Sequence, residues 1–243
     1  MNIFTLTTSY TFEFTLIAML AASAYFILER YKLSNEYKSI STLAFLTTFL
    51  AVIEYYNMRE FFSLSNLNNP NINYPTEYRY ITWFIATPIM LYTFFVISKI
   101  YKTNKIIVSI ALSLNFLMIV SGYFSESSFS NSTMPLYFSY IMFIIGFGSW
   151  LGILYIFNFI LPKVIQANNV NGMMHIQNCL SIVNKFIVYG WAIYPLGLAI
   201  SFYDSSVETA LTREIIYNFG DLFNKVGFSL TCFLCAARLS RNT

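Results

Sequence analysis

The sequence predicts an all-α membrane protein, in which a bundle of seven transmembrane helices forms a single domain over residues 1–243. Apolar residues account for 57% of the chain and charged residues for only 10%. An ordinary soluble domain carries about a quarter charged residues. Seven apolar segments are each long enough to cross about 30 Å of hydrocarbon, which takes roughly 20 helical residues. The composition therefore leaves almost no room for a soluble module.

The basic residues predict how these segments are oriented. The expected spans are residues 9–29, 39–61, 77–98, 104–124, 134–161, 177–203 and 208–238. Ten lysines and arginines lie on the side of the membrane that holds the C-terminus and the loops after the first, third and fifth spans, whereas only Arg59 and Arg213 lie on the other side. Because basic loops stay in the cytoplasm, we expect the N-terminus outside and the C-terminus in the cytoplasm. The net charge of +3 comes from these loops, so nucleic acid is not an expected partner.

The second span contains a buried carboxylate, Glu54, which is followed by Tyr55. An ionisable group inside a membrane span is usually functional. Two interpretations stay open for Glu54: a neutral, hydrogen-bonded carboxyl group, which burial favours, or a charge with a role in the site.

The third span carries two neighbouring stripes of side chains, because residues spaced by three, four and seven share a helix face. One stripe consists of Arg79, Thr82, Ala86 and Thr93, and the next consists of Trp83, Thr87 and Met90. Pro88 should kink this helix in the middle of the membrane. Further along the chain, aromatic and small residues recur inside the spans at Gly122, Trp150, Trp191 and Tyr194.

The last span holds a lysine, Lys225, near its centre. Asp221 precedes it by four residues, so both side chains lie on one face of the helix. One interpretation is an ion pair that only holds helices together. The other is a desolvated amine that forms a Schiff base with an aldehyde, with Asp221 as its counterion.

Four motifs together resemble the microbial (type I) rhodopsins of the proteorhodopsin branch. They are Arg-Tyr-x-x-Trp with a following Thr-Pro at 79–88, Phe-Ile-Ile-Gly at 143–146, Gly-Trp-Ala-Ile-Tyr-Pro at 190–195 and Asp-x-x-x-Lys at 221–225. The resemblance implies a light-absorbing protein of the bacterial plasma membrane that is not an enzyme. It also implies all-trans-retinal bound covalently to Lys225, and assembly into homo-oligomers.

The same resemblance implies the residues of the retinal pocket. A long polyene needs a rigid apolar slot with ring faces on both sides. The slot residues that match the family are Trp83, Trp191 and Tyr194, with Thr87 and Met90 beside them, and Trp150 and Gly122 are expected to close the ring end. Tyr55 matches the tyrosine that hydrogen-bonds the aspartate of the last helix.

In this family three positions of the third helix tune function: the proton acceptor, a residue one turn on, and the proton donor. Here they are Thr82, Ala86 and Thr93, a set similar to the Thr-Ala-Thr (TAT) rhodopsins. Threonine cannot accept a proton near neutral pH. We therefore expect a non-pumping photoreceptor whose Schiff base, with Asp221 as its one primary counterion, loses its proton easily. The alternatives are an inward anion pump, or a weak proton pump in which Glu54 is the acceptor.

A calcium site is a further expectation. Glu54 and Asp221 could converge near Lys225, and their oxygens are ligands suited to a hard cation such as Ca²⁺. Arg79 argues against this site, because its fixed positive charge could pair with the same carboxylates. The loops carry no recognisable docking motif for a signalling partner.

Overall fold

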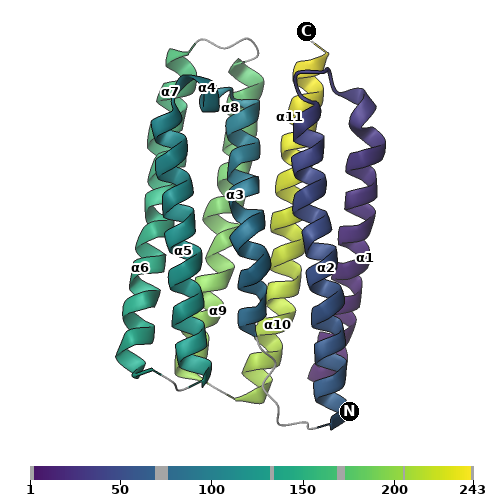
Figure 1. Ribbon diagram of the computed structural model, residues 1–243, viewed down its shortest axis with the longest axis vertical. Helices are drawn as coiled ribbons and strands as arrows, with labels where there is room; N and C mark the ends of the chain where they lie inside the picture. Colours follow the sequence, from purple (N-terminus) through teal and green to yellow (C-terminus); the bar gives the residue numbers. More distant parts are fainter. Residues whose placement is uncertain (1–2, 69–75, 132–133, 169–172, 205, 242–243) are drawn as a thin grey trace.

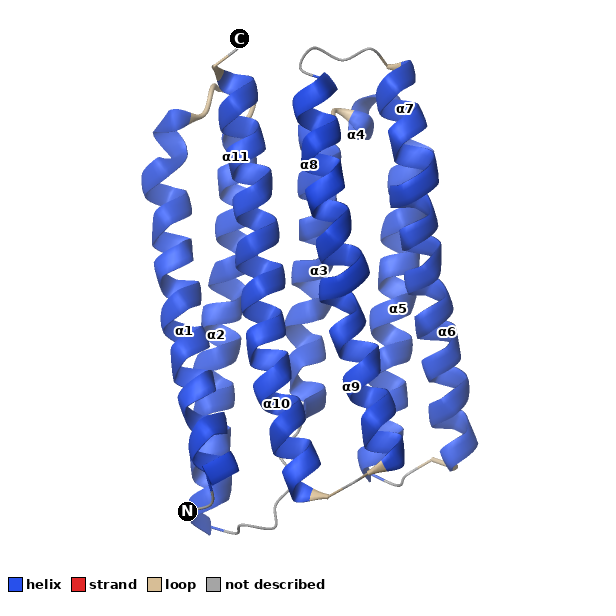
Figure 2. Ribbon diagram, turned by 180° about the vertical axis from the view of Figure 1, so that it is seen from behind, coloured by secondary structure: helices blue, strands red, loops and turns tan. Residues whose placement is uncertain are grey.

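The protein forms a bundle of long helices whose two termini lie at opposite ends (Figure 1). This computed structural model describes residues 3–68, 76–131, 134–168, 173–204 and 206–241. Every regular element in these ranges is helical, as Figure 2 shows. The face at the bottom of Figure 1, where the chain begins, is called the N-terminal face, and the opposite face is called the C-terminal face.

The described residues form eleven α-helices. They are α1 (Ile3–Leu28), α2 (Lys38–Asn68), α3 (Arg79–Ile97), α4 (Ile100–Thr103), α5 (Lys105–Asn131), α6 (Leu136–Tyr155), α7 (Leu161–Ala167), α8 (Met173–Lys185), α9 (Trp191–Tyr203), α10 (Val207–Asp221) and α11 (Phe228–Ser240). The short 3-10 turns Glu29–Lys32 and Thr76–Tyr78 follow α1 and precede α3. Three π-helical turns, Ile156–Ile160, Phe186–Gly190 and Leu222–Gly227, join α6 to α7, α8 to α9 and α10 to α11.

The described residues contain seven helical segments long and apolar enough to cross a membrane, which confirms the predicted fold class. These segments are Ile3–Lys32, Lys38–Leu64, Arg79–Ile97, Lys105–Phe129, Leu136–Ala167, Met173–Tyr203 and Val207–Ser240. The first helix starts six residues before the predicted residue 9. Polar residues do not stop it there, because the Thr8 hydroxyl donates to the Phe4 carbonyl at 2.8 Å, one turn back. A hydroxyl satisfied in this way is compatible with a continuous helix.

Two of the π-helical turns face each other and bring the last helix close to its neighbour. The Asn224 amide donates to the Gly190 carbonyl at 2.9 Å and to the Tyr194 hydroxyl at 3.1 Å. A Cβ atom on Gly190 would lie 1.8 Å from the Asn224 Oδ1 atom, so only glycine fits at this contact. Such π turns are frequent at functional sites, and one of these two contains Lys225.

The two halves of the bundle differ in polarity. On the side of the C-terminal face, α3, α7, α8 and α11 pack a continuous apolar core that includes Phe94, Phe95, Phe157, Phe228 and Phe233. On the N-terminal side, buried polar and charged side chains replace much of this apolar packing. Lys225 lies at the boundary between these two halves.

Candidate functional site

Lys225 lies in the middle of the bundle, with only 3% of its side chain exposed. Its Nζ donates to the Glu54 Oε2 atom at 2.9 Å and to the Asp221 Oδ2 atom at 3.0 Å. Asp221 comes from the preceding turn of the same helix, as its spacing predicts, and Glu54 comes from α2. That Asp221 is the one primary counterion stays a prediction. The chain fold brings a second carboxylate as close to the amine as the first.

Four donors from three further helices hold the Asp221 carboxylate in place. Its Oδ1 atom accepts hydrogen bonds from the Tyr194 hydroxyl at 2.6 Å and from the Trp83 indole nitrogen at 3.1 Å. Its Oδ2 atom accepts one from the Tyr55 hydroxyl at 3.0 Å, and Arg79 Nη1 approaches it at 3.5 Å. The contact expected between Tyr55 and Asp221 is thus present. Charge-assisted bonds of this kind stabilise a buried carboxylate in its ionised form.

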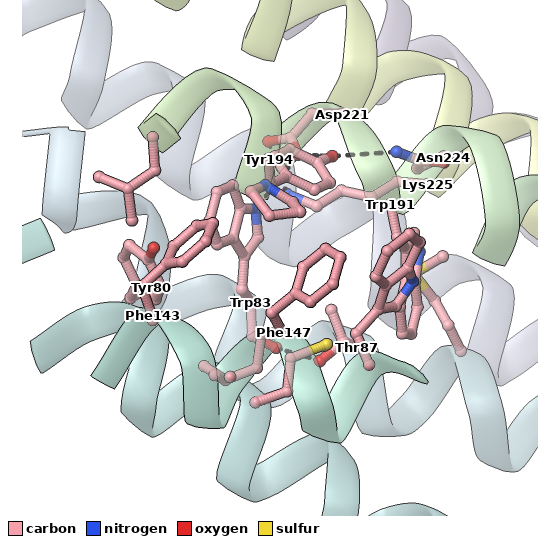
Figure 3. Close-up of a pocket in the computed structure, with 18 residues that line it drawn as sticks. Tyr80, Trp83, Thr87, Phe143, Phe147, Trp191, Tyr194, Asp221, Asn224 and Lys225 are labelled. Atoms are coloured by element: carbon pink, nitrogen blue, oxygen red, sulfur yellow. Dashed lines mark hydrogen bonds and ion pairs between the residues drawn. The ribbon is translucent and has the colours of Figure 1, made fainter. Parts of the chain in front are cut away.

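A cavity with an empty volume of about 760 Å³ opens beside Lys225. Its walls are almost entirely apolar and aromatic, and Figure 3 shows the rings of Trp83, Trp191 and Tyr194 next to the lysine and Asp221. A Cβ atom on Gly122 would lie 2.9 Å from the Tyr80 ring, so a larger residue there would push this ring out of its place in the wall. An apolar cavity lined by one buried amine and the Asp221 carboxylate fits a long polyene aldehyde such as retinal.

The structure brings most of the predicted pocket residues to this cavity. The lining includes Trp83, Thr87, Met90, Gly122, Trp150, Trp191, Tyr194, Asp221 and Lys225. Glu54, Tyr55 and Arg79 lie behind the lysine and contact it or Asp221. Thr82 and Ala86 are buried but are not among the lining residues. Their place beside the cofactor stays a prediction.

Thr93, expected at the donor position, lies on the C-terminal side of the cavity. Its hydroxyl donates to the Ile89 carbonyl at 2.7 Å, one turn back in α3. A hydroxyl engaged with its own helix has neither the charge nor the proton affinity of a donor carboxylate.

A chain of buried charges that the sequence did not predict runs from Arg79 toward the N-terminal face. Arg79 Nη2 donates to the Glu214 Oε2 atom at 2.7 Å, and Thr76 donates to the other oxygen of Glu214 at 2.6 Å. Arg213 donates to the Thr76 hydroxyl at 2.7 Å and pairs with Glu126 at 3.4 Å. One signal could have identified Glu214: it precedes Asp221 by seven residues and Lys225 by eleven, so it lies on the same helix face.

The geometry adds no support to the predicted calcium site. Within the described ranges, no group of three or more His, Cys, Asp or Glu side chains could hold a metal ion. Glu54 and Asp221 converge as expected, but both already contact the Lys225 amine. A calcium ion at these two carboxylates therefore stays a prediction.

Comparisons with known proteins agree with this arrangement. The sequence model of the family described as "Bacteriorhodopsin-like protein" matches residues 6–239. The chain is 28% identical over 252 residues to the green-light absorbing proteorhodopsin of Gamma-proteobacterium EBAC31A08, with 97% of this chain and 88% of the relative covered. It is 27% identical over 240 residues to the blue-light absorbing proteorhodopsin of Gamma-proteobacterium Hot 75m4, with the same coverage. The crystal structure of Exiguobacterium sibiricum rhodopsin superposes with a TM-score of 0.90 at 35% identity, over 98% of this chain and 99% of that one.

Proposed function

The chain belongs to the bacteriorhodopsin-like family, and we propose that it is a non-pumping photoreceptor with all-trans-retinal bound to Lys225. Members of this family hold retinal through a lysine Schiff base and act as light-driven transporters or photoreceptors, not as enzymes. Retinal supplies the absorption of light when it is bound. What this chain adds is the environment of the Lys225 nitrogen, and that environment favours a sensor over a pump.

The observation that carries this proposal is the distribution of buried charge. The buried charged side chains of the described residues are Glu54, Arg79, Glu126, Glu214, Asp221 and Lys225. All of them lie at the level of Lys225 or toward the N-terminal face, because they come from the middle of α2, the start of α3, the end of α5, α10 and the π-helical turn that follows α10. Toward the C-terminal face the core is apolar. A proton pump needs a group on that side to return a proton to the site.

The position of Glu54 supports a proton transfer that occurs only between Lys225 and Glu54. Its Oε2 atom lies 2.9 Å from Lys225 Nζ, within reach for direct transfer. Its Oε1 atom is buried and has no hydrogen-bond partner among the described residues, so a proton can bind there without breaking an existing bond. We infer that Glu54 takes the proton from Lys225 after illumination and returns it to the same nitrogen. In the dark, the two carboxylates stabilise the positive charge on the nitrogen, so the easily lost proton predicted from the sequence is retained only as a transfer to Glu54 after illumination.

The two alternative functions fit this geometry less well. In an inward anion pump the anion needs a cation to neutralise it, but Lys225 already contacts two carboxylates. A third negative charge at this place would be repelled. A proton pump with Glu54 as acceptor would still need a donor on the C-terminal side, where the three-residue set of Thr82, Ala86 and Thr93 offers none.

We also propose the membrane orientation that the basic residues predict, with the N-terminal face outside a bacterial plasma membrane. The polar chain from Arg79 to Glu126 then faces the exterior, and the apolar core faces the cytoplasm. Assembly into homo-oligomers and the similarity to Thr-Ala-Thr rhodopsins belong to the same proposal. Both come from the sequence resemblance.

Illumination of cells that express the protein with retinal tests the absence of transport. We expect no sustained change in external pH, with or without a protonophore, and no change when sulfate replaces chloride. A steady acidification that a protonophore abolishes would overturn the proposal in favour of a proton pump, and a chloride-dependent alkalinisation would favour an anion pump. The Lys225→Ala variant is the control for retinal attachment: it should insert into the membrane but stay colourless.

A further inference from the structure

Arg79 is completely buried, and the structure shows which groups determine its position. Its Nη2 atom donates to the Glu214 Oε2 atom at 2.7 Å and to the Asn218 Oδ1 atom at 2.5 Å. Its Nε atom donates to the same Glu214 oxygen at 3.3 Å. The contact of its Nη1 atom with Asp221 is longer, at 3.5 Å. Arg79 therefore lies closer to Glu214 than to the carboxylate that contacts Lys225.

Arg79 Nη1 also donates to the Tyr55 hydroxyl at 2.9 Å. Of these three partners, Glu214 and Asn218 are themselves held by residues of other elements. Glu214 is 2% exposed, and its second oxygen accepts the Thr76 hydroxyl at 2.6 Å. Asn218 is fully buried, and its amide donates to the Thr11 hydroxyl of α1 at 2.9 Å. A buried network in which each member is satisfied keeps its geometry, because any shift leaves a polar group without a partner. Glu214 and Asn218 thus form a fixed pair of anchors.

The position of Arg79 has a direct electrostatic consequence for Lys225. The Asp221 Oδ2 atom is shared between Lys225 Nζ at 3.0 Å and Arg79 Nη1 at 3.5 Å. A closer arginine would neutralise more of the Asp221 charge and leave less of it to stabilise a positive charge on the lysine nitrogen. We propose that Glu214 and Asn218 are positioning residues that hold Arg79 away from Asp221. They thereby set how strongly the retinal linkage at Lys225 keeps its proton.

This inference rests on the proposed attachment of retinal to Lys225, but not on the choice between sensor and pump. The measurable quantity is the pH at which half of the visible absorption band has converted to the near-ultraviolet band of the unprotonated linkage. If Arg79 is released, the lysine nitrogen loses counterion strength and this midpoint falls. An opposite charge within about 4–6 Å moves a pKa by about 1–3 units. Arg79 already lies within this range of Asp221, so a shorter distance changes only a part of that shift, about half a pH unit.

The test compares two variants that release Arg79 in chemically different ways. Glu214→Gln removes the charge of one anchor. Asn218→Leu replaces the other anchor by an apolar side chain of similar size and leaves the charge of the site unchanged. We expect both variants, loaded with retinal, to lower the midpoint by about half a pH unit. Glu214→Asp, which keeps the carboxylate, should stay near the wild-type midpoint. Glu208→Gln, an exposed position of the same helix, is the matched control and should not shift it.

A double-mutant cycle shows whether the effect passes through Arg79. In an Arg79→Gln background, Glu214→Gln and Asn218→Leu should shift the midpoint much less than in the wild type. An unchanged midpoint in Asn218→Leu, or an undiminished shift in the Arg79→Gln background, would overturn the inference and leave Glu214 as a distant charge only. If Glu214→Gln does not fold, Asn218→Leu and Asn218→Ser decide the question. Failure of the wild type itself to form a visible band would instead contradict the proposed function.

Discussion

Replacement of Glu54 by glutamine is the sharpest perturbation of the site. The substitution keeps the size of the side chain and removes one negative charge from a position 2.9 Å from the Lys225 nitrogen. Glutamine can still accept a hydrogen bond from this nitrogen, so the change is mainly electrostatic. We expect the retinal-bound variant to lose its visible band at a lower pH than the wild type, because the positive charge on the nitrogen loses one of two nearby carboxylates.

The structure bounds the size of this effect. Coulomb's law for unit charges 2.9 Å apart, with an effective dielectric constant of about 20, gives about 6 kcal/mol. This is an upper limit, equivalent to roughly four pH units at about 1.4 kcal/mol per unit. Asp221 remains at 3.0 Å, and the new amide retains a hydrogen bond, so much of the positive charge stays compensated. A fall of about one to three pH units is therefore expected, as for other opposite charges at this range.

The assay is an absorption titration of the purified, retinal-bound protein from mildly acidic to alkaline pH. The matched control is Glu60→Gln, which removes a carboxylate from the same helix at a position where about half of the side chain is exposed. Its midpoint should equal that of the wild type. An unchanged midpoint in Glu54→Gln would mean that Glu54 is neutral in the dark. A neutral Glu54 cannot accept the proton of Lys225, so this result would refute the proposed role of Glu54.

Three further predictions use other parts of the site. Thr82→Asp should raise the titration midpoint by adding a carboxylate near Lys225, and an unchanged titration would mean that residue 82 does not face the lysine nitrogen. Calcium chloride should produce a saturable blue shift that an ionic-strength-matched sodium chloride control and the Glu54→Gln variant both lack; equal responses to the two salts would remove the calcium site. Gly190→Ala should lower the free energy of unfolding by about 1–3 kcal/mol, because its Cβ atom would lie 1.8 Å from a neighbouring amide oxygen. Thermal melting checks this against Gly148→Ala, whose Cβ atom has no neighbour within 4 Å.

Much of the fold follows from local properties of the chain. Long apolar segments must form helices in a membrane, because each backbone polar group needs a partner within the segment itself. This rule correctly predicted seven spans, although it missed the first six residues of the first helix. The pairing of Asp221 with Lys225 was also predictable, because side chains four residues apart on one helix meet regardless of the rest of the fold.

Contacts between helices were less accessible to sequence reasoning. The resemblance to known rhodopsins led to most of the aromatic wall, since each of those residues sits in a recognisable motif. It did not identify Glu214 or Asn218, which lie outside the motifs, and it did not show that Glu54 contacts the lysine directly. Isolated polar residues in a span could face lipid, a neighbouring helix or the site. Spacing along one helix does not distinguish these cases.

The sequence by itself determined the class of the protein, the number of its membrane spans and the lysine that it offers to an aldehyde. Only the tertiary structure decided how the buried charges are paired. Many residues of the chain separate Glu54, Arg79 and Lys225. Glu54 nevertheless contacts Lys225 directly, and Asp221 contacts both Lys225 and Arg79, all within 3.5 Å. The strength of such interactions depends on distances of a few ångströms between different helices. Those distances follow from the packing of the whole bundle.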